Sequence, residues 1–234
     1  PAEQPVSEAR ESALIHPIQL RLLRLANNLV MAPMAGVSNL PFRLIARESG
    51  AALAFTETVS AKGLVVGGAK TWRLLRSSPR EAPVAFQLFG SDAAILGEAC
   101  RRLADQGSRW IDFNMGCPVP KFIKNCAGSA LLRDLPRATS ILREMRRAFS
   151  GTFSLKLRTG WDAGSIVAPE MARIAASEGV ELISIHGRTR AQQYTGLADR
   201  EIIRKVVETV PQTPVLANGD IESAQDVFSM LRET

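Results

Sequence analysis

Histidine, tyrosine and cysteine are scarce in this sequence. Its 234 residues include two histidines, one tyrosine and three cysteines, which are Cys100, Cys117 and Cys126. The cysteine count is odd and no C-x-x-C pair occurs, which argues against a disulfide framework and against a zinc site. A protein of the reducing cytoplasm fits this cysteine usage best.

Long apolar runs are absent as well. No stretch reaches the length of a membrane span, and no charged segment followed by an apolar one opens the chain as in a signal peptide. Hydrophobic residues nevertheless make up 46% of the chain, which is enough for one domain with a large core. We therefore expect one soluble domain and no membrane partner.

Basic residues outnumber acidic ones, and the net charge is +6. A positive protein is compatible with an anionic partner. Excess arginine on solvated helix faces would give the same net charge, so the charge alone leaves both interpretations open.

Seven short apolar segments alternate with helical patterns along the chain. Segments of this kind, bounded by Gly, Pro, Asn or Asp, are typical of strands buried on both faces. We predict strands at residues 29–32, 52–56, 84–88, 110–113, 153–157, 182–185 and 215–217. We predict helices at residues 40–48, 93–106, 136–149, 167–178 and 200–209, another from Ser223, and weakly patterned helical sequence over 60–77.

This alternation predicts an α/β fold with a parallel sheet whose outer face is covered by helices. A (β/α)8 TIM barrel, here with about seven of its eight βα units, agrees best with the polar loops after the strands. A doubly wound sheet is the alternative, although no G-x-G-x-x-G sequence opens any unit. Because the chain stops at Thr234 before an eighth unit, we expect a fragment of a longer protein.

The incomplete barrel is expected to cover residues 15–234. Residues 1–14 are polar and charged, so we expect a loose tail there. Residues 15–25 alternate apolar with polar side chains and are compatible with a helix face or a small hairpin. We expect this segment to form a short cap under the core.

Cys117 is the first candidate for chemistry. It lies between Gly116 and Pro118, just after the strand at 110–113, where α/β enzymes place functional loops. A nucleophilic thiol would need a lowered pKa and a nearby base, whereas a general acid would keep its proton at neutral pH. A packing role, which is usual for free cysteine and which we expect for Cys100, is the third possibility.

Two further polar residues interrupt apolar strands. Lys156 lies among Phe and Leu, and Gln87 lies within Ala-Phe-Gln-Leu. A lysine inside a barrel needs an anionic or electron-rich partner, although a lysine that points outward can extend to solvent between helices. Together with Asn114, these residues place polar groups at the ends of three consecutive strands. That convergence predicts a binding site.

The last two strands also end in polar segments. Asn218-Gly-Asp220 precedes a helix and is a candidate for a phosphate site, although an ordinary tight turn has a similar sequence. His186 could contact a phosphate or a ring, or form only a local hydrogen bond. The basic residues expected around the same end of the barrel, its mouth, are Lys121, Lys124, Arg188 and Arg190.

Taken together, these motifs resemble the tRNA-dihydrouridine synthase family, and within it the B-type bacterial branch. The resemblance runs from about residue 18 to the end of the chain and depends on several motifs in the right order. They are Ala32-Pro-Met-Ala-Gly36, Thr56-Glu57, Gln87, Asn114-Met-Gly-Cys-Pro118, Lys121, Ala127-Gly-Ser-Ala-Leu131, Lys156-Leu-Arg-Thr-Gly-Trp161, His186-Gly-Arg-Thr-Arg190 and Asn218-Gly-Asp-Ile221.

The resemblance implies an FMN enzyme that reduces the C5=C6 bond of a tRNA uridine to 5,6-dihydrouridine with NADPH. In that family a hydride passes from flavin N5 to C6, and the cysteine that matches Cys117 protonates C5. The residues that match cofactor contacts are Pro33, Met34, Ala35, Gln87, Lys156, His186, Asn218, Gly219 and Asp220. The residues expected near the uridine or the RNA backbone are Asn114, Lys121, Arg158 and Arg188.

The sequence departs from the family pattern at its end. The family continues with an eighth strand that completes the phosphate site and with a C-terminal helical domain that binds tRNA, and this chain contains neither. Two other functions stay open as alternatives: a flavin oxidoreductase that acts on a free small molecule, and an RNA-binding or regulatory protein without turnover.

Overall fold

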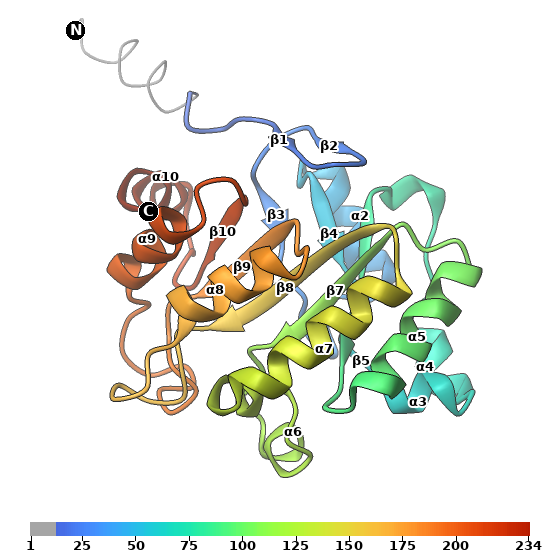
Figure 1. Ribbon diagram of the computed structural model, residues 1–234. Coiled ribbons are helices and arrows are strands. Elements are labelled where there is room, and N and C mark those ends of the chain that lie inside the picture. Colours follow the sequence, from blue (N-terminus) through green and yellow to red (C-terminus); the bar gives the residue numbers. More distant parts are fainter. Residues whose placement is uncertain (1–12) are drawn as a thin grey trace, which may run out of the picture.

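Figure 1 shows the computed structural model, which describes residues 13–234. Of the tail expected at residues 1–14, residues 1–12 lie outside the described residues. A curved sheet forms the centre of the molecule, and helices cover its outer face (Figure 1). No helix within residues 13–234 is long and apolar enough to cross a membrane.

The sheet consists of parallel strands in the order β10-β9-β8-β7-β6-β4-β3, and β5 also pairs with β6. Its strands are β3 (Val30–Met31), β4 (Leu53–Phe55), β5 (Val59–Ser60), β6 (Val84–Phe89), β7 (Trp110–Met115), β8 (Thr152–Arg158), β9 (Leu182–His186) and β10 (Val215–Asn218). The seven predicted strands and the parallel barrel-like architecture are thereby confirmed. Only β5 was not predicted, because Val59 and Ser60 lie at the edge of the weakly patterned segment over 60–77 and do not belong to an apolar run.

Six long helices occupy the predicted positions, and most of them begin at a side-chain cap. They are α2 (Leu40–Glu48), α5 (Ala93–Asp105), α7 (Leu135–Ala148), α8 (Ala168–Ser177), α9 (Arg200–Thr209) and α10 (Ala224–Glu233). Side-chain oxygens that accept a backbone N–H in the first turn belong to Asn39, Asp92, Asp134, Asp199 and Ser223. Such caps satisfy N–H groups that have no partner within the helix, so short polar residues determine where each helix starts.

The weakly patterned sequence over 60–77 forms two short helices, α3 (Ala61–Val65) and α4 (Ala69–Leu74). Gly67, with φ +77°, lies between them. This backbone conformation favours glycine and ends α3 after little more than one turn. Helix α6 (Pro120–Lys124) and the 3-10 helices η1 (Pro79–Glu81) and η2 (Gly128–Arg133) were not predicted, because segments this short have no detectable periodicity.

The residues of 15–25 form a hairpin, which was one of the two predicted alternatives. Its strands are β1 (Ile18–Gln19) and β2 (Arg24–Leu25), which pair antiparallel. Buried apolar side chains of the hairpin cluster with residues near the amino ends of sheet strands, such as Leu53, Trp110 and Leu182. The hairpin therefore closes the amino-terminal end of the barrel, as the predicted cap would (Figure 1).

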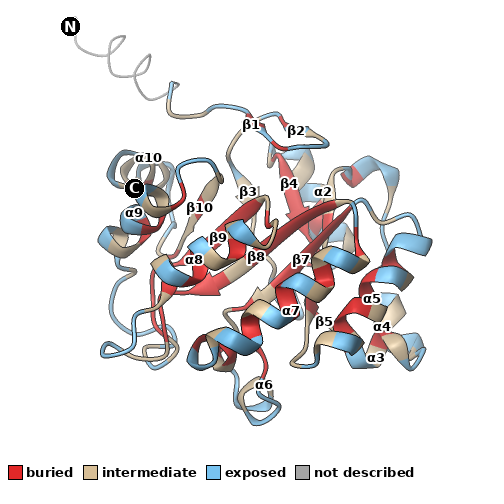
Figure 2. Cartoon of the chain, in the orientation of Figure 1, coloured by how far each residue is buried: buried red, intermediate tan, exposed pale blue. Residues whose placement is uncertain are grey.

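The largest core lies between the sheet and its outer helices. Figure 2 shows buried strands through the centre and exposed outer faces on the helices. Helices α5, α7 and α8 each place a fully buried side chain in this core, namely Leu96, Leu142 and Met171. The same core contains strand residues such as Phe153 and Ile183. Burial of each such side chain contributes about 1.5–3 kcal/mol. This packing fixes the strands and thus the positions of the residues at their carboxyl ends.

A buried ion pair attaches α2 to the segment before β6. The Arg43 guanidinium donates to both Glu81 carboxylate oxygens, with distances of 2.6 and 3.0 Å, and both side chains are inaccessible to solvent. Arg43 also donates to the carbonyl of Ser38 at 2.8 Å. Because Ser38 bonds to Met34 in turn, this ion pair supports the loop that follows β3.

Candidate active site at the carboxyl ends of the strands

The polar residues predicted to converge lie on neighbouring strands. Asn114 on β7 is opposite Lys156 on β8, and Asn218 on β10 is opposite His186 on β9. Asn114, His186 and Asn218 belong to the strands themselves, although the sequence suggested that the strands ended before them. The apolar run ends at these positions, but the hydrogen-bonded ladder continues, so alternation along each strand still sets the direction of the side chain.

The loop of Cys117 is held on both sides by hydrogen bonds. The Asn114 side-chain oxygen accepts from the backbone N–H groups of Gly116 at 3.1 Å and Cys117 at 3.0 Å. The carbonyl of Cys117 accepts from the N–H of Ser129 at 3.1 Å and from its hydroxyl at 2.9 Å. Gly128 is needed for this approach, because a Cβ at that position would lie 2.8 Å from the Cys117 carbonyl oxygen.

Cys117 is half-buried, and its environment favours the neutral thiol. Burial raises its pKa, while the backbone N–H of Val119 and the charge of Arg158 lower it by less. A thiol with a raised pKa carries its proton at neutral pH, which suits a general acid better than a thiolate nucleophile. The expected inert role of Cys100 agrees with its complete burial in α5, which raises its pKa to about 12.

Lys156 points into the barrel rather than outward between helices. Its ammonium donates one hydrogen bond, to the Asn218 side-chain oxygen at 2.8 Å. Burial lowers the pKa of Lys156 to about 8, and Arg158 lowers it further, while Asp112 opposes this shift. An ammonium has three N–H donors. Because only one of them is used within the described residues, Lys156 can bind an electron-rich group at the barrel mouth.

Asp112 is a buried acid that sequence analysis did not single out. It is fully buried on β7 and accepts hydrogen bonds from Gln87 at 2.7 Å and from the Ser154 hydroxyl at 2.5 Å. Burial raises the pKa of Asp112 to about 6, although the bonds from Ser154 and Gln87 and the charge of Lys156 oppose the rise. The available signal was an acidic residue in an apolar strand, the same signal that identified Lys156.

His186 lies at the end of β9 and is a neutral imidazole at physiological pH. Burial and then the neighbouring cations Arg158, Lys156 and Arg188 lower its pKa to about 3. A Cβ on Gly219 would lie 2.9 Å from the ring, so the chain passes His186 closely at that point. The ring can therefore accept or donate a hydrogen bond, but it does not contribute positive charge to the site.

We predict that replacing His186 makes stability less sensitive to acid. A histidine in the unfolded chain titrates near 6.5, whereas His186 in the folded protein titrates near 3. As the pH falls below 6.5, the unfolded chain takes up a proton that the folded protein does not, so stability is lost. Between about pH 7.5 and about pH 4.5, the wild-type free energy of unfolding should fall by about 3 kcal/mol more than that of His186→Gln.

Urea unfolding at the two pH values measures this difference. The matched control is His16→Gln, which removes the other histidine from an exposed position before the barrel. This control should lose as much stability in acid as the wild type. Equal acid sensitivity of His186→Gln and the wild type would contradict the lowered pKa.

The Asn218-Gly-Asp220 segment forms a turn with unusual backbone angles. Gly219 has φ +122° and Asp220 has φ +54°. The Asp220 carboxylate accepts from the N–H of Ala198 at 2.7 Å and pairs with Arg188 at 2.6 Å. The N–H groups of Gly219 and Asp220 donate to no other group within the described residues. The turn can therefore offer two backbone donors to an anion.

The predicted contact loop at Pro33, Met34 and Ala35 lies at the end of β3. Met34 and Ala35 are exposed. The N–H of Gly36, the next residue, donates to the carboxylate of Glu57 at 2.5 Å. This bond holds the loop beside the end of β4. It gives Glu57, of the Thr56-Glu57 motif in the sequence, a structural role.

Arg158 and Arg188, expected near RNA, are both buried and bonded to the protein's own carbonyl groups. Arg158 donates to the carbonyls of Gly116 at 3.0 Å, Thr189 at 2.8 Å and Gln193 at 2.6 Å. Arg188 donates to two carbonyls of residues 195 and 196 in addition to its ion pair with Asp220. Their positive charge lies at the mouth, but their side chains connect loops rather than extend into solvent.

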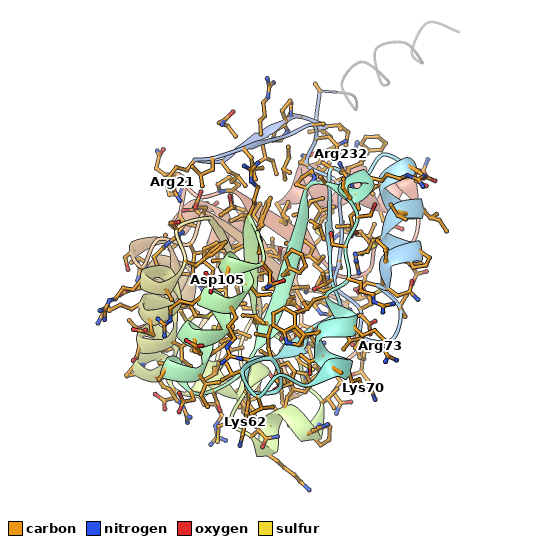
Figure 3. All side chains as sticks on the ribbon, turned by 90° about the vertical axis from the view of Figure 1, so that its right-hand side faces the viewer. Arg21, Lys62, Lys70, Arg73, Asp105 and Arg232 are labelled. Carbon is orange, nitrogen blue, oxygen red and sulfur yellow. The ribbon has the colours of Figure 1, made fainter. Side chains whose placement is uncertain are left out.

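Exposed positive charge comes from other residues at the same end of the barrel. Three short helices carry exposed cations. They are Lys62 on α3, Lys70 and Arg73 on α4, and Lys121 and Lys124 on α6. None of them forms an ion pair within the described residues. Figure 3 shows Lys62, Lys70 and Arg73 at one end of the molecule, away from Arg21 on the capping hairpin.

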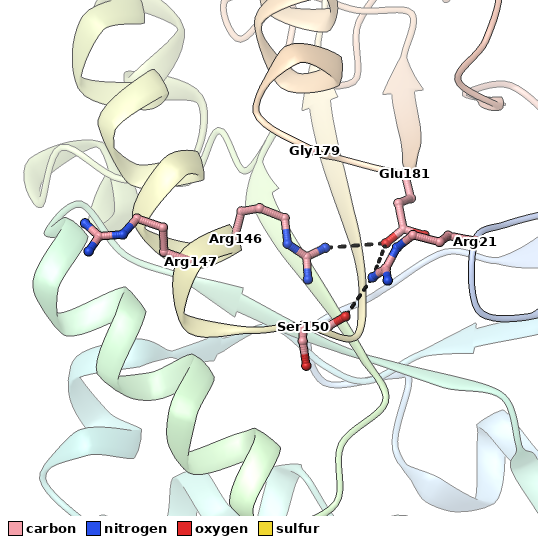
Figure 4. Close-up of a pocket in the computed structure, with 6 residues that line it drawn as sticks. All are labelled: Arg21, Arg146, Arg147, Ser150, Gly179 and Glu181. Carbon is pink, nitrogen blue, oxygen red and sulfur yellow. Dashed lines mark hydrogen bonds and ion pairs between the residues drawn. The ribbon is translucent and has the colours of Figure 1, made fainter.

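A surface pocket of about 410 Å³ lies at the opposite end of the barrel (Figure 4). Ser150 and Glu181 in its wall precede β8 and β9, so the pocket borders the amino ends of the strands. Glu181 pairs there with Arg21 and Arg146, each at 3.4 Å. None of the predicted site residues lines this pocket, and two of its three arginines share the Glu181 carboxylate.

Comparison with known proteins agrees with this arrangement. The family model described as dihydrouridine synthase (Dus) matches residues 30–234. The chain belongs to the dihydrouridine synthase family. The resemblance predicted from the motifs is thereby confirmed.

Similar relatives come from several bacteria. The probable tRNA-dihydrouridine synthase of Rhizobium leguminosarum bv. phaseoli is 43% identical, over 89% of this chain and 65% of the relative. Two proteins named tRNA-dihydrouridine synthase B are each 39% identical to this chain. The match to the protein from Xanthomonas campestris pv. campestris covers 93% of this chain and 65% of the relative. The match to the protein from Pseudomonas aeruginosa covers 90% of this chain and 63% of the relative. The chain thus spans about two thirds of the length of these relatives.

Among solved structures, mandelate oxidase with (S)-2-phenylpropionate has a similar fold. The TM-score is 0.59 at 22% identity, and the match covers 92% of this chain and 64% of the other. At this level of identity the likeness concerns the fold alone.

Proposed function

We propose that this protein reduces a uridine of tRNA to 5,6-dihydrouridine, with FMN as bound cofactor and NADPH as reductant. The observation that carries the proposal is the convergence of Cys117, Lys156 and Asn114 at the carboxyl ends of adjacent strands. The family membership of residues 30–234 supports the same reaction.

The donors at the mouth fit a flavin. Lys156 has N–H groups available beyond its bond to Asn218, and Gln87 has a second amide hydrogen beyond its bond to Asp112. Both suit the electron-rich polar edge of a flavin ring, and the backbone N–H groups of Gly219 and Asp220 suit its phosphate. Met34 and Ala35 would contact the ring from the loop after β3. Bound in this position, reduced FMN would supply the hydride.

Cys117 would supply the proton. Its pKa is raised by burial, so the thiol holds a proton at neutral pH and can deliver it to the carbon that becomes negatively charged. The neighbouring Arg158 guanidinium would stabilise the thiolate that remains after transfer, since its charge lowers the thiol pKa. Asn114 fixes the loop that carries the thiol.

The charge distribution supports an RNA substrate. The exposed cations on α3, α4 and α6 lie along one side of the end of the barrel at which Cys117 lies (Figures 1 and 3). RNA phosphates are attracted to such a surface, and the target base must leave its stack to enter a pocket inside the barrel. We propose that Lys121 contacts the RNA backbone, and that the protein acts in the cytoplasm, where tRNA is modified.

We predict that the whole protein binds FMN and that Lys156→Met weakens this binding. The purified protein should show a flavin absorption band that bleaches on anaerobic addition of NADPH, and it should then form dihydrouridine in unmodified tRNA. Lys156→Met removes a charged hydrogen-bond donor and keeps an unbranched side chain that is one atom shorter. Its FMN dissociation constant should therefore rise at least about tenfold.

The matched control for this experiment is Lys205→Met, because Lys205 is exposed on α9 and pairs with Glu201. It should bind FMN like the wild type. If the whole protein bound no added FMN, the proposal of a flavin cofactor would be wrong. Reduction of free uracil in preference to tRNA would favour the small-molecule oxidoreductase instead, and tRNA binding without bleaching would favour an RNA-binding protein.

A further inference from the structure

A continuous chain of hydrogen bonds runs through the inside of the barrel. Toward the amino-terminal end of the barrel, the Trp110 indole N–H donates to the Ser154 hydroxyl at 2.8 Å, and this hydroxyl donates to one Asp112 oxygen at 2.5 Å. The other Asp112 oxygen accepts from the Gln87 amide nitrogen at 2.7 Å. All four side chains are buried, with at most 1% of their surface exposed.

The chain continues from Gln87 to the loop of Cys117. The Gln87 amide oxygen accepts from the Asn114 amide nitrogen at 3.0 Å. The Asn114 oxygen in turn accepts from the backbone N–H groups of Gly116 and Cys117, at 3.1 and 3.0 Å. Asp112 and Cys117 are thus connected through two amide side chains, although they do not touch.

The Asp112 carboxylate determines the direction of every bond between it and the Cys117 loop. An ionised carboxylate is an acceptor only, so the Gln87 nitrogen must face Asp112 and the Gln87 oxygen must face Asn114. The Asn114 nitrogen then faces Gln87, which leaves the Asn114 oxygen for the two backbone N–H groups. If both amides were reversed, donors would meet donors at the Cys117 loop. The observed direction is therefore the one in which all these groups are satisfied.

We propose that Asp112 is a positioning residue for Cys117, because its carboxylate fixes both amides and, through them, the loop that carries the thiol. The relevance of this role to catalysis rests on the proposed function, in which Cys117 donates the proton. The same bonds use both lone pairs of the Asn114 amide oxygen and one of the Gln87 oxygen, so toward a ligand these two residues offer mainly N–H groups. The site should accordingly select ligands that present carbonyl oxygens or unprotonated ring nitrogens.

The test follows the alkylation rate of Cys117 by iodoacetamide in the whole protein. Trypsin places Cys117 in the peptide of residues 110–121 and Cys126 in the peptide of residues 125–133, so mass spectrometry resolves the two. Cys126 is exposed and serves as the internal reference. Neither flavin nor tRNA is needed, so this measurement can succeed even if the proposed function fails.

Asp112→Leu and Gln87→Leu should each raise the rate at Cys117, relative to Cys126, by at least about fivefold, because a buried amide loses its partner and the loop opens more often. The double variant should react no faster than Gln87→Leu alone, since both changes break the same chain. Asp112→Asn, which preserves the shape of the side chain, is the second variant and should raise the rate at least about twofold.

The matched control is Ser154→Ala, which removes the bond to the other Asp112 oxygen and leaves Gln87 paired. Its Cys117 rate should stay within about twofold of the wild type, because the direction of the amides is unchanged. Wild-type rates in Asp112→Leu or Asp112→Asn would overturn the proposal. The proposal would also be overturned if the rate increases of Asp112→Leu and Gln87→Leu multiplied in the double variant, because Asp112 would then act on Cys117 by a route other than Gln87.

Discussion

Replacing Cys117 with alanine should lower the rate of uridine reduction in tRNA by at least about 100-fold, the loss typical when a positioned proton donor is removed. The thiol is the proposed acid, and its raised pKa keeps the proton available at neutral pH. Transfer of electrons from NADPH to the bound flavin should continue, because that step does not need this proton. Dihydrouridine is measured by mass spectrometry of nucleosides, and flavin reduction by absorbance.

Cys126→Ser is the matched control for this prediction. Cys126 lies nine residues further along, is exposed, and follows α6 outside the hydrogen-bonded loop. The control should form dihydrouridine at the wild-type rate. A Cys117→Ala protein that retains more than about a third of the wild-type rate would refute the role of the thiol as acid.

Removing the carboxylate of Glu81 should lower the free energy of unfolding by about 3–5 kcal/mol. The Glu81→Ala variant leaves the Arg43 guanidinium buried without its two charged hydrogen bonds, which measure 2.6 and 3.0 Å. No solvent reaches either side chain. The uncompensated charge is costly because protein interiors solvate ions poorly. Urea unfolding monitored by circular dichroism measures the loss.

The double variant Arg43→Met with Glu81→Leu separates the charge from the packing. It removes both ions and fills the space with apolar side chains, so it should lose less stability than Glu81→Ala. A double variant that is at least as unstable as the single one would mean that packing, rather than the unpaired charge, dominates. Arg80→Met is the surface control, because its ion pair with Glu48 is exposed and should contribute at most about 1 kcal/mol.

The stability of this ion pair also matters for the candidate site. Arg43 donates to the Ser38 carbonyl, and the Ser38 hydroxyl bonds to Met34 in the loop that would contact the flavin. An ion pair in the wall of the barrel is thus connected by hydrogen bonds to a loop at its mouth. The sequence contained both residues, but 38 positions separate them, and no local pattern connects them.

Prediction from sequence succeeded where burial on both faces leaves a local signal. The strands from β4 to β10, apart from the short β5, lie within one or two residues of their predicted ranges, because parallel strands covered by helices are predominantly apolar and the polar residues within them are few. The helices predicted at residues 93–106 and from Ser223 do start at side-chain caps, which are Asp92 and Ser223. Short elements such as α6 and η2 were missed because their form depends on contacts rather than on periodicity.

Within the site, the sequence indicated which strand ends are polar but not the direction of each side chain. Lys156 was predicted with an outward alternative, and only the pairing of β8 with β7 and β9 places its ammonium beside Asn218. Arg158 and Arg188 were expected at an RNA surface, yet they bond to backbone carbonyls of loops up to 42 residues away. An arginine gives the same sequence signal in both settings.

The sequence by itself determined the family, the alternation of strands and helices, and the placement of Cys117, Gln87, Lys156 and Asn218 at strand ends. These properties depend on residue type and on short-range spacing, which are written directly in the chain. The tertiary structure alone decided which of these groups meet, that Asp112 anchors the hydrogen bonds leading to Cys117, and that the thiol is neutral. Hydrogen-bond partners and pKa values depend on neighbours brought together across strands, and only the pairing and packing of the strands in the folded sheet supply those neighbours.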